Sequence, residues 1–306
     1  MLKFEAYLAL PANTSTGGFD HAAIHQAARR LYVAHTSNNA VDVIDCQSDR
    51  YLHSIPGLVG VAGALVSNER DLVFTSNRGE DTISIFSPEN ETGAVRVGVG
   101  SHPNGLSFDP ERGILLVANV GDPAIPDSFT LSIVSVARHK MIASIPVPAR
   151  TRWTVYDPQA DVFFVNIAKP PLIGVVDGND PTRIAYTLDI PADGPHGLDL
   201  DTNNRRLFCA CDDKQLVTVD LGSGKVQSQT SLSGIPDVIF FNPGLEHLYV
   251  AIGDPGLIEV FDTHTMQRIE SVPTEGGAHT LAFDPVGNKI YAFLPQTNRA
   301  AIYRDQ

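Results

Sequence analysis

Apolar and polar residues alternate along the chain in short runs that polar turns separate. Seven of these runs resemble one another: RRLYVAH, DLVFTSN, GILLVAN, DVFFVNI, RRLFCAC, EHLYVAI and NKIYAFL. A further alternating run follows each of them, as in NAVDVID, DTISIFS and GLIEVFD, and a fourth run follows most of them. A period of two residues predicts β-strands and excludes a helical solenoid, in which apolar positions recur about every 3.6 residues.

The unit of four runs repeats through the whole chain. The segments SHPNGLSFDP, GPHGLDLD and GAHTLAFDP are copies of one entry strand. Their equivalents give unit starts near residues 20, 62, 104, 152, 196, 237 and 279, separated by 41 to 48 residues. Four strands at a period in the low forties are typical of a β-propeller blade. The sequence therefore predicts one all-β domain over residues 1–306, a seven-bladed β-propeller with four antiparallel strands per blade.

The two ends of the sequence predict how the ring closes. The last unit stops after its third run, AAIYRDQ, whereas residues 3–11 have the alternation of a fourth strand. A strand without a neighbour leaves backbone groups open to aggregation, and pairing removes that edge. We therefore expect residues 3–11 to complete the last blade.

The LYVA and LVAN runs near FDP turns resemble the YVTN family of seven-bladed propellers over nearly the full length. This resemblance implies the architecture but no single function, because that family includes surface and scaffold proteins and its relatives include lactonases and lyases. The chain departs from the family pattern in five blades, where the usual asparagine is replaced by His35, Ile167, Cys211, Ile252 and Leu294.

Equivalent residues that enter the first strands should form a ring at one mouth of the central channel. In blade order this ring is Asp20, Ala62, Asn104, Arg152, His196, Asp237 and His279. Blades five, six, seven and one are neighbours in a closed ring, and they supply two histidines and two aspartates. Side chains of these types repel each other or shift their pKa values unless a cation lies among them. We therefore expect a metal site formed by Asp20, His196, Asp237 and His279, although a one-residue slip would exchange Asp20 for His21.

The expected ligand set indicates both the ion and its chemistry. Mixed histidine and aspartate ligation favours Zn²⁺, Mn²⁺ or Fe²⁺, and Ca²⁺ is possible for a set dominated by oxygen. Such an ion polarises a substrate oxygen and acidifies a bound water. His35 or His21 would transfer the proton, and Arg152 would stabilise the anion that forms. With the resemblance to propeller lactonases, this predicts a metal-dependent hydrolase acting on a lactone, ester or phosphotriester at the channel mouth.

Polar and aromatic residues near the ring are candidates for a substrate pocket, namely Asn104, Trp153, Asn77 and Asn119. Each candidate also has an ordinary structural interpretation. The ring residues could bond to each other and to channel water, Arg152 could pair with Asp20 or Asp237, and Trp153 could pack between blades. A non-enzymatic binding or scaffold propeller and a copper or iron redox or lyase enzyme therefore remain alternatives.

The net charge of the chain restricts the classes of partner that we expect. The sequence leaves the cellular compartment and the oligomeric state open. The net charge of −13 repels phosphate backbones and anionic lipid, so we expect a small-molecule substrate and neither nucleic acid nor membrane. The first residues, MLKFEAYLAL, carry Glu5 within a short apolar stretch, which is a poor signal peptide. This is compatible with a cytoplasmic protein and with an exported one whose leader has been removed.

Overall fold

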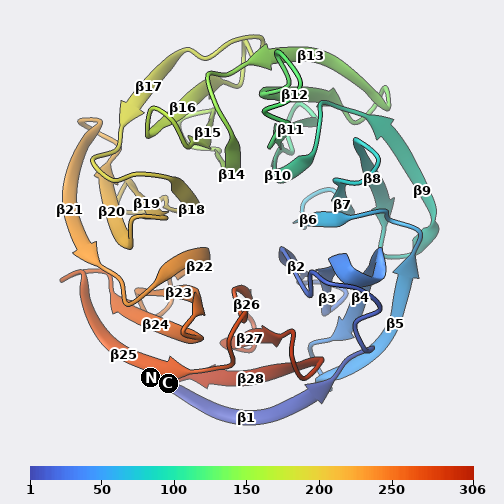
Figure 1. Cartoon of the computed structure of the whole chain (residues 1–306), viewed down its shortest axis with the longest axis vertical. Helices are drawn as coiled ribbons and strands as arrows, with labels where there is room; N and C mark the ends of the chain where they lie inside the picture. Colours follow the sequence, from blue (N-terminus) through green and yellow to red (C-terminus); the bar gives the residue numbers. More distant parts are fainter.

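The computed structural model describes residues 1–306 and consists of seven four-stranded antiparallel sheets arranged as a ring (Figure 1). Blade 1 contains β2 (Ala22–His25), β3 (Arg30–His35), β4 (Ala40–Asp45) and β5 (Arg50–Pro56). Blade 2 contains β6 (Val61–Ser67), β7 (Leu72–Asn77), β8 (Thr82–Ser87) and β9 (Asn90–Gly98). Blade 3 contains β10 (Pro103–Asp109), β11 (Ile114–Asn119), β12 (Thr130–Ser135) and β13 (Lys140–Pro146). Blades 4 and 5 contain β14 (Thr151–Asp157), β15 (Val162–Ile167), β16 (Leu172–Asp177) and β17 (Tyr186–Asp189); and β18 (Pro195–Asp201), β19 (Arg206–Cys211), β20 (Gln215–Asp220) and β21 (Lys225–Ser231).

Blade 6 contains β22 (Ile235–Asn242), β23 (His247–Asp254), β24 (Leu257–Asp262) and β25 (Gln267–Pro273), and blade 7 contains β26 (Thr280–Asp284), β27 (Lys289–Leu294) and β28 (Arg299–Asp305) together with β1 (Leu2–Ala9). The chain's single helix is a 3₁₀ turn, η1 (Thr36–Asn38). It is too short to cross a membrane. The predicted seven-bladed architecture is confirmed.

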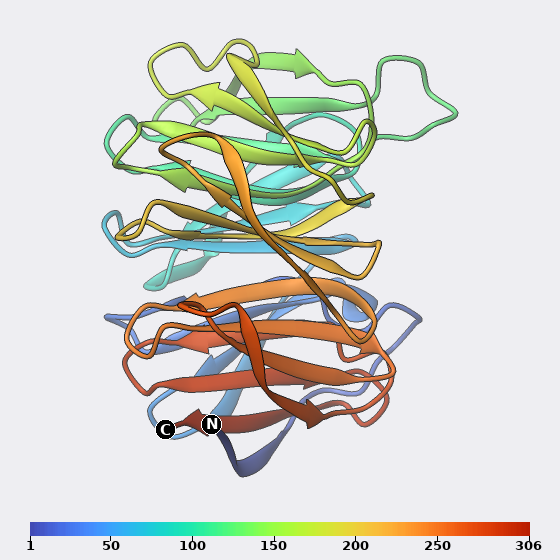
Figure 2. The same cartoon turned by 90° about the vertical axis from the view of Figure 1, so that its left-hand side faces the viewer.

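The N-terminal strand closes the ring, as predicted. β1 pairs antiparallel with β28, with Leu2 opposite Asp305 and Ala9 opposite Arg299. The two termini therefore lie side by side at the outer edge of blade 7 (Figures 1 and 2).

The apolar core is divided among the seven contacts between neighbouring blades. Each contact contains its own cluster of buried apolar residues, from nine residues between blades 1 and 2 to thirteen between blades 7 and 1. Alternation in the inner strands points successive side chains to opposite faces, so each blade contributes to two clusters. No blade has a core of its own.

A recurrent Asp-Pro segment marks the turn between the first and second strands of several blades. Asp109 Oδ1 accepts hydrogen bonds from the backbone N–H groups of Glu111 and Arg112, and Asp157 Oδ1 likewise accepts one from Gln159. A side chain that bonds the backbone two residues ahead fixes a tight turn. These turns lie at the opposite mouth from the entry residues, so each first strand runs along the wall of the channel from one mouth to the other.

Candidate functional site

Three of the four expected metal ligands come together at the entry mouth. His196 Nε2 lies 3.1 Å from Asp237 Oδ1, and His279 Nε2 lies 4.0 Å from Asp237 Oδ2. The fourth, Asp20, instead pairs with His21 Nε2 at 3.4 Å and with Arg78 Nη2 at 3.4 Å. His196, Asp237 and His279 therefore lie together with Asp237 at the centre, whereas Asp20 is turned toward blade 2.

His196 is held between two carboxylates and an arginine. Its Nδ1 lies 2.7 Å from Asp212 Oδ1, which orients the ring and leaves Nε2 directed toward the mouth. Arg152 Nη1 lies 2.6 Å from that Nε2 and donates to it when the imidazole is neutral. Arg152 Nη2 also lies 3.5 Å from Asp212 Oδ2. Arg152 therefore points into the channel mouth and interacts with the Asp212–His196 pair.

Burial and charge act in opposite directions on these groups. Burial alone lowers the pKa of His196, but Asp237 and Asp212 overcome it and the pKa is raised. Burial raises the pKa of Asp237, but His196 and His279 overcome it and hold it well below its ordinary range. Asp212 is shifted downward in the same way, against burial, by His196 and Arg152. The mouth thus favours ionised carboxylates beside a histidine that gains a proton readily.

Three guanidinium groups gather at the same mouth, and we call Arg78, Arg150 and Arg152 the arginine cluster. Burial, followed by the charge of Arg152, lowers the pKa of Arg150, and Arg78 contributes in the same direction. Arg150 has no ion pair and its guanidinium makes no hydrogen bond, whereas Arg78 and Arg152 have acidic partners. Arg150, which is exposed, is therefore the one cation of this cluster without an acidic side-chain partner.

The structure places His35, Asn77 and Asn119 inside their blades rather than at a pocket. Both ring nitrogens of His35 are used, Nδ1 by Asp42 at 2.7 Å and Nε2 by Asn13 at 2.8 Å, and the residue is fully buried. The amide nitrogens of Asn77 and Asn119 each donate to two hydroxyl groups of the adjoining third strand at 2.9–3.0 Å. These side chains tie strands together, because a buried polar group needs partners wherever it lies.

Asn104 lies in the ring beside Arg152 and is also buried. Its side-chain oxygen has no hydrogen-bond partner, and its backbone oxygen accepts from the Ser76 hydroxyl at 2.7 Å. This oxygen is enclosed by the protein, so a ligand donor could reach it only after neighbouring side chains move.

The donor geometry bears on metal binding. No group of three or more histidine, cysteine, aspartate or glutamate side chains is arranged so that it could hold a metal ion. His196 Nε2 already faces Arg152, and a metal at that nitrogen requires its lone pair. A cation can use this arc only if Arg152 moves away.

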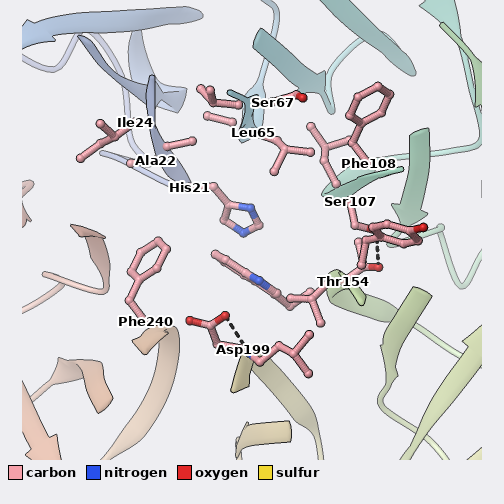
Figure 3. Close-up of a pocket in the computed structure, with 18 of the residues that line it drawn as sticks. His21, Ala22, Ile24, Leu65, Ser67, Ser107, Phe108, Thr154, Asp199 and Phe240 are labelled. Carbon is pink, nitrogen blue, oxygen red and sulfur yellow. Dashed lines mark hydrogen bonds between the residues drawn. The ribbon is translucent and has the colours of Figure 1, made fainter. Parts of the chain in front are cut away.

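A cavity lies beyond the charged mouth, on the other side of His21 and Trp153. These two rings come from blades 1 and 4, and their centroids are 4.0 Å apart across the channel. Burial lowers the pKa of His21, so its imidazole is mainly neutral at neutral pH. The cavity beyond them has a volume of about 510 Å³ and reaches the turns that follow the first strands. Figure 3 shows His21 at its centre, with Phe240 and Asp199 on one side and Ser107 and Thr154 on the other. We call this cavity the apolar pocket.

Comparison with known proteins identifies the family. A family model of YNCE-like β-propellers matches residues 54–303. The chain belongs to the YNCE-like β-propeller family. The resemblance to YVTN-type propellers is thereby confirmed for the architecture. A search of curated proteins gave no significant match for this YNCE-like propeller.

Solved structures of similar fold include two from very different settings. Hydrazine synthase of Kuenenia stuttgartiensis superposes with a TM-score of 0.83 at 14% identity, covering 96% of this YNCE-like propeller and 97% of that chain. A chain of the mitotic checkpoint complex superposes with a TM-score of 0.83 at 11% identity, covering 99% and 91%. Identities this low show the fold alone.

Sequence reasoning missed Arg78 and Arg150 at the mouth and Asp199 in the apolar pocket. Arg150 lies two residues before Arg152, and Arg78 directly follows the end of β7. Their positions next to strand ends could have indicated from the sequence that both arginines lie at the entry mouth. No comparable signal identified Asp199 in this YNCE-like propeller, because β18 changes register between Pro195 and Gly197.

Proposed function

We propose that this propeller binds a small organic anion at the entry mouth, with the arginine cluster as its anion-binding element. The observation that supports this best is Arg150, a guanidinium with no acidic partner beside two further arginines. Clustered guanidiniums repel one another, and a carboxylate or phosphate relieves that repulsion with charge-assisted hydrogen bonds.

The Asp212–His196 pair gives this site the elements of a general base. Asp212 holds the ring through Nδ1, so Nε2 is directed toward the bound molecule. An anion that draws Arg152 to itself releases Nε2 from the 2.6 Å contact that now occupies it. Arg152 would then stabilise negative charge on the substrate while His196 accepts a proton from water or from a hydroxyl group.

Calorimetric titration with citrate and with inorganic phosphate tests the anion site. We expect saturable binding that weakens with salt, and a loss of at least about tenfold in affinity for Arg150→Gln and for Arg152→Gln, because a charged hydrogen bond contributes about 1.5–3 kcal/mol. Arg138→Gln is the matched control, since Arg138 is exposed on the turn between β12 and β13 and has no partner. Absence of saturable binding for both anions, or unchanged affinity in Arg152→Gln, would refute this proposal.

A metal-dependent hydrolase is the second candidate, and it is favoured by the convergence of His196, Asp237 and His279. Zinc, manganese or iron would occupy this arc once Arg152 has moved, and lactones, esters and phosphotriesters are the substrates to test. Elemental analysis of wild type and of the double variant His196→Ala, His279→Ala is the direct measurement. About one divalent ion per chain in the first and none in the second would support a metalloenzyme, and copper or iron would direct the search to redox or lyase chemistry. No metal in wild type after incubation with zinc, manganese and calcium would exclude it.

A further inference from the structure

The apolar pocket differs from the charged mouth in every chemical respect. It is lined largely by apolar and aromatic side chains, among them Phe108, Trp153, Phe240 and Phe283. Its lining includes no lysine or arginine and two carboxylates, Asp199 and Glu69. Glu69 is exposed at the rim and accepts from the Ser67 hydroxyl at 3.1 Å. The pocket is thus an apolar cavity whose only formal charges are negative, because burial keeps His21 mainly neutral.

The Asp199 carboxyl group is fixed in place but lacks a counter-ion. Its Oδ1 accepts from the backbone N–H of Leu200 at 2.8 Å, and its Oδ2 accepts from the backbone N–H of Phe241 at 2.6 Å. These bonds hold both oxygens while leaving each with a free lone pair. Asp199 forms no ion pair with any side chain, and burial raises its pKa to about 6 although the two backbone bonds oppose that shift.

The other acids of the interior show how this chain ordinarily treats a buried carboxylate. Six of the seven fully buried acids pair with a cation: Asp109, Asp157, Asp201, Glu259 and Asp284 with arginines, and Asp305 with the N-terminal amine. The seventh, Asp42, lies 2.7 Å from His35 Nδ1. Removing charge from water is costly unless a partner compensates it. Asp199, which is half-buried, has no such partner, and it lines a cavity that leaves room for a partner from outside.

We propose that the apolar pocket is a second binding site, specific for an organic monocation: a protonated or quaternary amine that carries an apolar body. Asp199 pairs with the ammonium group, and the aromatic side chains surround the rest of the molecule. A metal cation suits the pocket poorly, since hard ions require six or more oxygen ligands, whereas amines with weakly held water interact well with aromatic rings. The volume of about 510 Å³ lies within the range of ordinary small-molecule sites.

The sole tryptophan of the chain lines this pocket, so its fluorescence reports on occupancy. The probes are 2-phenylethylamine, a cation; 2-phenylethanol, its neutral counterpart; and phenylacetate, an anion. We expect the amine to bind at least about tenfold more tightly than the alcohol, and phenylacetate not to bind. Equal affinity for amine and alcohol, or no fluorescence change with either, would overturn the proposal without any variant being needed.

Two variants and a pH series assign the effect to Asp199. Asp199→Asn should bring the affinity for the amine down to that for the alcohol, while the alcohol binds as before. Asp189→Asn, an exposed acid on the outermost strand β17, should change neither. In wild type the affinity for the amine should rise with pH through about 6 as Asp199 ionises and then level off. Three other titratable groups face the pocket, namely Tyr156, Glu69 and His21. Tyr156 has a raised pKa and stays neutral, and the Asp199→Asn variant retains both Glu69 and His21. A pH dependence of amine binding that persists in Asp199→Asn would therefore contradict the assignment to Asp199.

Discussion

Neutralising Asp237 should lower the pKa of His196, and the structure gives the scale of the change. Asp237 Oδ1 lies 3.1 Å from His196 Nε2 in a partly buried mouth. Unit charges about 4 Å apart interact with about 4 kcal/mol at an effective dielectric constant of about 20, and carboxylates at such distances shift measured pKa values by about 1–3 units. We therefore expect Asp237→Asn, which preserves the shape of the side chain, to lower the pKa of His196 by about 1–3 units.

Proton NMR titration of the imidazole C–H signals measures this shift directly. The chain has ten histidines, so the His196 signal is assigned as the one absent from His196→Gln. Asp213→Asn, an exposed carboxylate next to the mouth, serves as the control and should leave the signal unchanged. An unchanged or higher pKa of His196 in Asp237→Asn would refute the electrostatic description of the mouth.

The same coupling has a consequence for stability. A histidine whose folded-state pKa is raised stabilises the fold fully below the unfolded-state value of about 6.5, and this contribution disappears as pH rises through the folded-state pKa. Asp237, whose folded-state pKa is lowered, contributes stability above the unfolded-state value of about 3.9, and this is lost as pH falls through the folded-state pKa. The attraction needs an ionised Asp237 and a protonated His196 together, because the histidines cause the lowering of the Asp237 pKa. Urea unfolding of wild type and Asp237→Asn should therefore differ most between about pH 4 and 6.5, and the difference should shrink toward alkaline pH as His196 loses its proton.

Two further predictions concern the blades themselves. Gly105→Ala should destabilise the protein by about 2 kcal/mol or more, because the added carbon would overlap the backbone oxygen of Arg152 in the next blade. Gly98 has open space around it, so Gly98→Ala should be tolerated. Urea unfolding of the two variants measures this difference. Asn119→Ala should cost about 1–3 kcal/mol, because the half-buried Thr130 hydroxyl and the buried Ser132 hydroxyl lose this donor. Citrate affinity should stay the same, and a weaker citrate titration would return Asn119 to the binding site.

The fold could be predicted from sequence because a propeller blade repeats a local pattern. Alternation identifies strands, Asp-Pro turns separate them, and the equivalence of His196 and His279 gives the period. Even the closure by β1 followed from a missing fourth run at one end and an extra run at the other. Each of these inferences needs only neighbouring residues and the two-residue period of a strand.

The site was predicted less completely because it depends on contacts across the ring and on strand irregularities. The first strands of blades 2 to 6 change register near their entry residues, for instance between Thr151 and Thr154 in β14. A bulge reverses which side chains face the channel. Counting alternate residues along β18 therefore cannot show that Asp199 reaches the apolar pocket. The contact between Arg152 and His196 joins different blades, and only the closed ring shows that an arginine occupies the nitrogen expected for a metal.

The division of the core among blade contacts has a consequence for how the chain could be taken apart. A cut in the connection between β13 and β14 would give two pieces, each ending in exposed apolar faces that formerly met: ten buried residues at the contact of blades 3 and 4, and thirteen at the contact of blades 7 and 1. The first piece would also carry β1, the strand that the second piece needs to complete blade 7. Such halves would be complementary parts of one split protein, soluble chiefly in each other's presence, and their joint elution as a single 33.0 kDa particle in size-exclusion chromatography would register the reassembly.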